Sequence, residues 1–190
     1  ESPAADRIRF VQDFYSEKYT KESGDFVCCK MTLEHIRPTY DFVSTVRRSI
    51  GARRDCLTYF LVPDAYRIVR DVAFEDVYYE HCSYFSRGSL ARLFARAGFE
   101  IRHVSTEYDG QYLAIEARPF EPAPAGYRPP DDDLGAMTEL VASFPSRCSA
   151  KTSHWRATVR DAVAAGRKVV LWGSGSKAVS FLTTLGLGVR

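Results

Sequence analysis

The residues best suited to proton chemistry lie together in one short stretch, Asp-Val-Tyr-Tyr-Glu-His-Cys-Ser-Tyr-Phe-Ser at residues 76–86. His and Tyr side chains can move protons, and a carboxylate beside an imidazole can orient it and support its charged form. The stretch holds His81, Glu80 and Tyr78, in a chain with only four histidines. It predicts a catalytic loop; the structural alternative is that the tyrosines fill the edge of the core and Glu80 pairs with an arginine.

A second carboxylate–imidazole pair, Glu34 and His35, follows an apolar, β-prone segment at residues 25–31. At the carboxyl end of a parallel strand, such a pair faces the crevice in which α/β proteins bind their ligands. The alternative is that Glu34 caps the helix that follows and that His35 is a packed histidine.

A third motif, Gly173-x-Gly175-x-x-Ala178, follows a β-prone segment at residues 168–172. Its glycines would let the backbone turn tightly and approach a phosphate at the N-terminus of a helix. The motif predicts that Gly173, Gly175 and Lys177 contact a substrate or nucleotide. The alternative is a tight strand-to-helix turn with no ligand.

Alternating strands and helices must position these groups. Apolar β-prone segments predict strands at residues 25–31, 56–62, 99–106, 111–118 and 168–172. Apolar periodicity predicts helices at residues 38–50, 89–97, 134–144 and 153–165. The order predicts an α/β fold with a mostly parallel sheet, and Asp109-Gly110 predicts a hairpin that adds an antiparallel strand at one edge.

The composition predicts more than one structural unit. Residues 119–133 contain five prolines and three consecutive aspartates. They predict a linker between a first domain at residues 1–118 and a second part at residues 134–190. Because the chain does not begin with Met and stops soon after the start of a new strand–loop–helix unit, we expect it to belong to a longer protein.

Charge and cysteine content narrow the class of protein. The net charge is +2 without a basic tract, which argues against a nucleic-acid partner, and no apolar run approaches the ~20 residues of a membrane span. The five cysteines include no Cys-x-x-Cys pair, so neither structural zinc nor a disulfide framework is expected, and a cytoplasmic location fits best.

Taken together, residues 25–36, 78–86, 89–99 and 170–177 resemble the S-adenosylmethionine-dependent C-methyltransferases, and most closely those that act on nucleotide-linked ketosugars. The resemblance covers about residues 8–190. It implies a partial class I methyltransferase (Rossmann-like) sheet, followed by the beginning of a second Rossmann-like unit.

The resemblance also implies roles for the candidate residues. His81 would be the base that removes a proton from the carbon next to a ketone, with Glu80 and Tyr78 orienting it or binding substrate. His35 would steady the enolate or the sugar, and Asp13 would contact the adenine of the cofactor. No metal is required by this mechanism.

The resemblance further implies what these residues lack and what they would bind. The main cofactor-binding loop of the family is missing from them, so we expect weak or no S-adenosylmethionine binding. The partner would be a small molecule such as a nucleotide sugar, and an exposed half-sheet would favour self-association. Two other hypotheses stay open, namely a nucleotide- or NAD-binding oxidoreductase fragment and a non-catalytic α/β domain.

Overall fold

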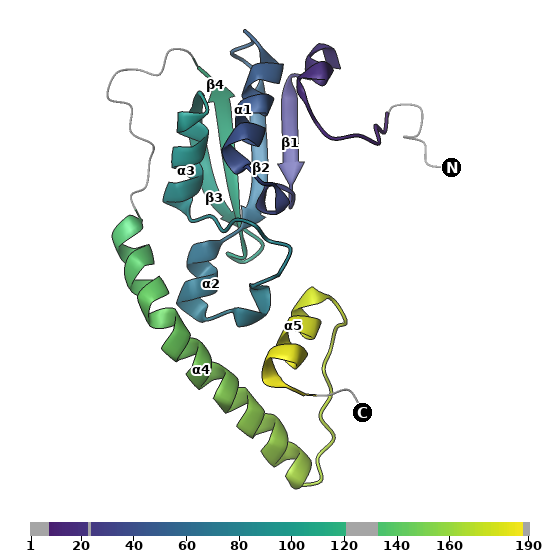
Figure 1. Ribbon diagram of the computed structural model, residues 1–190, viewed down its shortest axis with the longest axis vertical. Helices are drawn as coiled ribbons and strands as arrows, with labels where there is room; N and C mark the ends of the chain where they lie inside the picture. The colour runs from purple at the N-terminus through teal and green to yellow at the C-terminus, as the bar shows by residue number, and fades with distance from the viewer. Residues whose placement is uncertain (1–7, 23, 121–132, 188–190) are drawn as a thin grey trace.

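A four-stranded mixed sheet forms the centre of the computed structural model, which describes residues 8–22, 24–120 and 133–187 (Figure 1). The spatial order is β1-β2-β4-β3. The strands are β1 (Phe26–Lys30), β2 (Leu57–Pro63), β3 (Phe99–Glu107) and β4 (Tyr112–Pro119). Strand β1 pairs in parallel with β2, and β4 runs antiparallel to both of its neighbours. The predicted α/β class and the predicted hairpin are both confirmed.

The antiparallel strand lies inside the sheet, because β4 is inserted between β2 and β3. Most of its side chains are buried, including Leu113 and Ile115, whereas β3 carries the exposed residues Arg102 and His103. A strand buried along most of its length is stabilised by neighbours on both sides, and the more polar strand suits the edge. The hairpin thus lies at one edge of the sheet as predicted, but its edge strand is β3, which runs in the same direction as β1 and β2, and not the antiparallel β4.

Helices α1 (Thr39–Ile50) and α3 (Arg87–Arg96) lie on the same face of the sheet (Figure 1). The apolar side of α3 meets the sheet at three fully buried rings. The Phe94 ring packs 5.0 Å from that of Phe60 and 5.4 Å from that of Phe99. Ser86 caps α3 in a reciprocal capping box with Ser89, which sets where the helix begins after the His81 loop.

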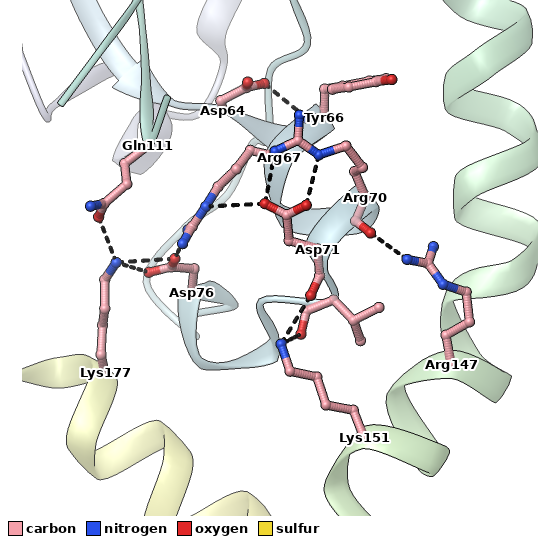
Figure 2. Close-up of polar contacts among 11 residues, drawn as sticks. Asp64, Tyr66, Arg67, Arg70, Asp71, Asp76, Gln111, Arg147, Lys151 and Lys177 are labelled. Carbon is pink, nitrogen blue, oxygen red and sulfur yellow. Dashed lines mark hydrogen bonds and ion pairs between the residues drawn. The ribbon is translucent and has the colours of Figure 1, made fainter. Parts of the chain in front are cut away.

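The long helix α4 (Leu134–Ala164) is continuous where the sequence predicted two helices. Pro145 removes one intrahelical hydrogen bond but does not end the helix. Tertiary contacts hold the middle of this helix. Arg147 donates to the carbonyl of Arg70 and Lys151 to that of Asp71, both at the end of α2 (Ala65–Asp71), as Figure 2 shows. Those carbonyls would otherwise lack partners at the helix terminus, so the contact stabilises both helices.

The Gly173–Gly175 turn precedes helix α5 (Ser176–Leu185), as predicted. The strand predicted at residues 168–172, however, is wrong: this segment forms neither helix nor strand and pairs with no strand in the described parts of the chain. Helix α5 packs on the short helix η4 (Phe74–Asp76), where the rings of Phe181 and Phe74 stack 5.9 Å apart. The second Rossmann-like unit stays a prediction, and so does the domain division, since residues 121–132 of its linker lie outside the described residues. None of the described helices is both long and apolar enough to cross a membrane.

Candidate active site

A cavity of about 410 Å³ lies where β1 and β2 reach their carboxyl ends. All four residues predicted to be catalytic line it, namely His81, Glu80, Tyr78 and His35. Its wall also includes Glu34, Asp76 and, from the start of α5, Lys177. The structure therefore brings together two sequence motifs that are more than forty residues apart along the chain.

Backbone hydrogen bonds hold the two motifs against each other. The Glu34 carbonyl, in the short helix η3 (Leu33–His35), accepts from the amides of Cys82 at 2.7 Å and Ser83 at 3.2 Å. The Tyr84 hydroxyl closes the loop through two hydrogen bonds. It accepts from the Tyr78 amide at 3.0 Å and donates to the Tyr78 carbonyl at 3.3 Å. The two histidines are thus positioned by the main chain.

His81 is partly exposed to the cavity and surrounded by rings. Its ring centroid lies 4.8 Å from that of His35 and 4.9 Å from that of Tyr78, both in edge-on contact. Its Nδ1 atom is buried and has no hydrogen-bond partner among the described residues. Burial, followed by the nearby His35, lowers the pKa of His81. The neutral ring, which can accept a proton, is thereby favoured.

Hydrogen bonding sets the orientation of His35. Its Nδ1 atom lies 3.2 Å from the Glu80 carbonyl oxygen. Because a carbonyl only accepts, Nδ1 carries the hydrogen, and Nε2 of the neutral ring keeps the lone pair. That Nε2 lies 3.9 Å from Oε1 of Glu34.

Glu34 lines the cavity although the sequence assigned a catalytic role only to its neighbour His35. The alternative that it caps the following helix is wrong, because α1 begins at Thr39 with Pro38 as its N-cap residue. Its side chain is fully buried, and neither carboxylate oxygen has a hydrogen-bond partner among the described residues. Burial raises the pKa of Glu34. Its place beside His35 in the motif was the one available signal.

Tyr78 is held by a carboxylate that the sequence also did not single out. Its hydroxyl donates to Oδ1 of Asp76 at 3.2 Å. Burial, together with the negative charge of Asp76, raises the pKa of Tyr78, so its hydroxyl stays protonated. Tyr78 can therefore support the ring of His81, but it is not a base.

Lys177, predicted to contact a substrate or nucleotide, reaches into this same wall. Its Nζ lies 2.9 Å from Oδ1 of Asp76 and 2.9 Å from Oε1 of Gln111 (Figure 2). Asp76 is nearly buried and also pairs with Arg67. Gly173 and Gly175 do not line the cavity, so only the lysine of that motif joins the other candidates.

We expect Asp76→Ala to destabilise the fold more than Lys177→Met does. Removing Asp76 leaves two cations facing each other, whereas removing Lys177 leaves Asp76 paired with Arg67. Because Lys177 is partly exposed, its pair contributes at most about 1 kcal/mol. Urea unfolding of both variants measures the difference, and an equal or larger loss in Lys177→Met would contradict this account of the pair.

Asp13, predicted to contact adenine, lies elsewhere. It lines a separate hollow of about 360 Å³ beside Phe26 and Val27, at the amino end of β1. Its carboxylate pairs with Lys18 and accepts from the Tyr19 hydroxyl, and these contacts lower the pKa of Asp13 to about 2. The structure does not bring it together with His81, and the adenine contact stays a prediction.

Comparisons with known proteins show what the chain is similar to. C-methyltransferase NovU from Streptomyces niveus is 30% identical over 142 residues, which make up 70% of this chain and 34% of NovU. The chain thus spans about a third of that relative's length. A solved structure, the N,N-8-amino-8-demethyl-D-riboflavin dimethyltransferase RosA from Streptomyces davawensis, aligns with a TM-score of 0.42 at 20% identity, over 52% of this chain and 30% of that one.

A family model settles the class of the chain. The model described as "Methyltransferase domain" matches residues 2–104, which is more than half of the sequence. The matched segment includes β1, β2, both histidines of the cavity and helix α3. The chain therefore belongs to the methyltransferase domain family.

Proposed function

We propose that this chain supplies the proton-abstracting side of a C-methyltransferase that acts on a small ketone such as a nucleotide-linked keto sugar. The observation that carries the proposal is the position of His81 at an open cavity, with its ring centroid 4.8 Å from that of His35. Burial lowers the pKa of His81, which favours the neutral ring that a base needs. Membership of the methyltransferase family and the similarity to a relative named as a C-methyltransferase support it. The substrate class comes from the resemblance in sequence.

In the proposed reaction, His81 accepts the proton from the carbon next to the ketone. General-base catalysis of this kind contributes about 10²–10⁴-fold, and the rest must come from positioning. His35 lies beside His81 in the cavity, where its Nε2 lone pair can accept a hydrogen bond from a hydroxyl group of the sugar. Tyr78 and the carbonyl of Glu80 fix the two imidazoles. S-adenosylmethionine, when bound, supplies the electrophilic methyl group that the carbon then takes up.

The described residues do not form a complete site for that cofactor. The segments after β1 and β2 that line the cavity, residues 31–38 and 63–68, contain no glycine. A Cβ added at Gly173 or Gly175 would meet nothing within 4 Å, so that turn is not an enclosed cradle. These residues therefore do not fit the methionine and ribose parts of the cofactor.

We accordingly expect the 190-residue chain alone to bind S-adenosylmethionine weakly or not at all. The physical reason is that backbone donors close to the cofactor supply much of such a site, and they require close approach by glycine. Isothermal titration calorimetry measures this binding directly. Micromolar affinity of the chain alone would show that the described residues are sufficient, against the proposal.

The proposed activity is tested in the longer protein to which we propose the chain belongs. Incubation with a labelled methyl donor and a nucleotide-linked keto sugar should place the label on carbon, as mass spectrometry and NMR would show. Titration with NAD(H), followed by nicotinamide fluorescence, should give no binding. Nicotinamide binding without methyl transfer would instead favour the oxidoreductase hypothesis based on Gly173-x-Gly175-x-x-Ala178.

A further inference from the structure

Three metal-ligating side chains converge at one end of the cavity. Glu34, His35 and His81 each present one ligand atom, and these atoms all lie within 4.8 Å of one another. They come from two segments of the chain, which the bonds from the Cys82 and Ser83 amides to the Glu34 carbonyl hold together. The convergence therefore follows from the fold and does not depend on one flexible loop.

The carboxylate of this cluster lacks a compensating partner. Glu34 is fully buried, and both of its oxygens are without hydrogen-bond partners among the described residues. An ionised carboxylate in such a position is unfavourable unless a cation or hydrogen-bond donors balance it. The contact that the structure describes for this carboxylate is with Nε2 of His35, 3.9 Å from Oε1, and that histidine belongs to the same cluster.

The imidazoles are oriented as metal ligands usually are. A metal-binding histidine commonly donates its other ring N–H to a backbone carbonyl, which fixes the tautomer and the ring orientation. His35 places Nδ1 against the Glu80 carbonyl and turns Nε2 toward Glu34. His81 adds a buried Nδ1 atom with no partner in the described parts of the chain.

We propose that Glu34, His35 and His81 form a binding site for one divalent transition-metal ion of the zinc class. Two imidazoles and one carboxylate are the ligand set of open zinc sites, which leave a position for water or substrate. Imidazole ligands favour zinc and its neighbours over magnesium or calcium, which prefer oxygen.

The ligand atoms must close slightly around the ion. Tetrahedral zinc with bonds of about 2.1 Å needs ligand atoms about 3.4 Å apart. The ligand atoms of Glu34, His35 and His81 now lie up to 4.8 Å apart, and side-chain rotation would bring them to that distance. His35, whose side chain is 44% exposed, has the freedom to make that movement.

Metal binding has a consequence that rests on the proposed function. Coordination uses the imidazole lone pair, and proton abstraction by His81 uses that same lone pair. The proposed reaction needs no metal, so a bound ion and the base compete for one residue. Zinc should therefore inhibit methyl transfer by the longer protein, and a chelator should restore it.

The binding site is tested without any activity assay, by calorimetric titration of Zn²⁺ and by the visible absorption of Co²⁺ with the 190-residue chain. We expect one ion per chain and no comparable binding of Mg²⁺. Glu34→Gln and His35→Gln should each weaken zinc binding by at least about tenfold, the lower end of what even outer-shell partners cost. The control His103→Gln, an exposed histidine on β3, should bind as the unmodified chain does.

Two results would overturn the site. One is unchanged zinc affinity in His35→Gln, a variant of a half-exposed side chain whose fold circular dichroism can verify even if Glu34→Gln misfolds. The other is a thiolate-to-cobalt charge-transfer band, which would assign the ion to cysteines such as Cys82. Zinc binding that leaves methyl transfer unchanged would keep the site and argue against His81 as the base, so the two proposals can fail separately.

Discussion

Replacing His81 with alanine lowers methyl transfer by the longer protein by at least about 10²-fold, the lower end of what a general base contributes. The ring faces the cavity, and Tyr78 and Tyr84 surround it, so its loss removes the proton acceptor but not the loop. Cofactor affinity should change little, because His81 is proposed to act on the methyl acceptor. Steady-state kinetics with a nucleotide-linked keto sugar, paired with a cofactor titration, measures both effects.

The matched control for this variant is Tyr79→Ala. Tyr79 lies in the same loop, two residues from His81, but its side chain is fully exposed and does not line the cavity. Its removal should leave turnover near that of the unmodified protein. Turnover near wild type in His81→Ala would remove this histidine from the mechanism.

Phe94→Ala destabilises the fold by about 3–5 kcal/mol, which is the usual cost of removing a buried phenylalanine. The ring is fully buried between Phe60 of β2 and Phe99 of β3, where it fastens helix α3 to the sheet. Urea unfolding of the 190-residue chain, followed by circular dichroism, measures the change in the free energy of unfolding.

Phe14→Ala is the control for this core variant, since it deletes the same atoms from a side chain that is 92% exposed. Its effect should stay within about 0.5 kcal/mol. Equal midpoints and slopes for Phe94→Ala and the unmodified chain would show that the core is not organised around this ring.

The meeting of His35 and His81 could be predicted from the sequence, because each follows one of two strands that pair in parallel and end at the same side of the sheet. The insertion of β4 between β2 and β3 could not be predicted from the sequence. The Asp-Gly turn predicts that the two strands form a hairpin, but it does not predict which of the two also pairs with β2.

The missed features depend on long-range contacts. Helix α4 continues through Pro145 because Arg147 and Lys151 reach the carboxyl end of α2, almost eighty residues away in the chain. The role of Asp76 depends on Lys177, which is 101 residues further on. The backbone of Glu34 is likewise held by the 76–86 loop, whose Cys82 and Ser83 amides donate to its carbonyl. Local patterns carry no information about such pairs.

The most direct test of the central claim is hydrogen exchange at the acceptor carbon. The longer protein is incubated in D₂O with a nucleotide-linked keto sugar and without methyl donor, and NMR follows the proton next to the ketone. The account predicts that the unmodified protein and Tyr79→Ala exchange this proton for deuterium, while His81→Ala exchanges it at least about 10²-fold more slowly. Equal exchange rates in His81→Ala and the unmodified protein would contradict the assignment of His81 as the base.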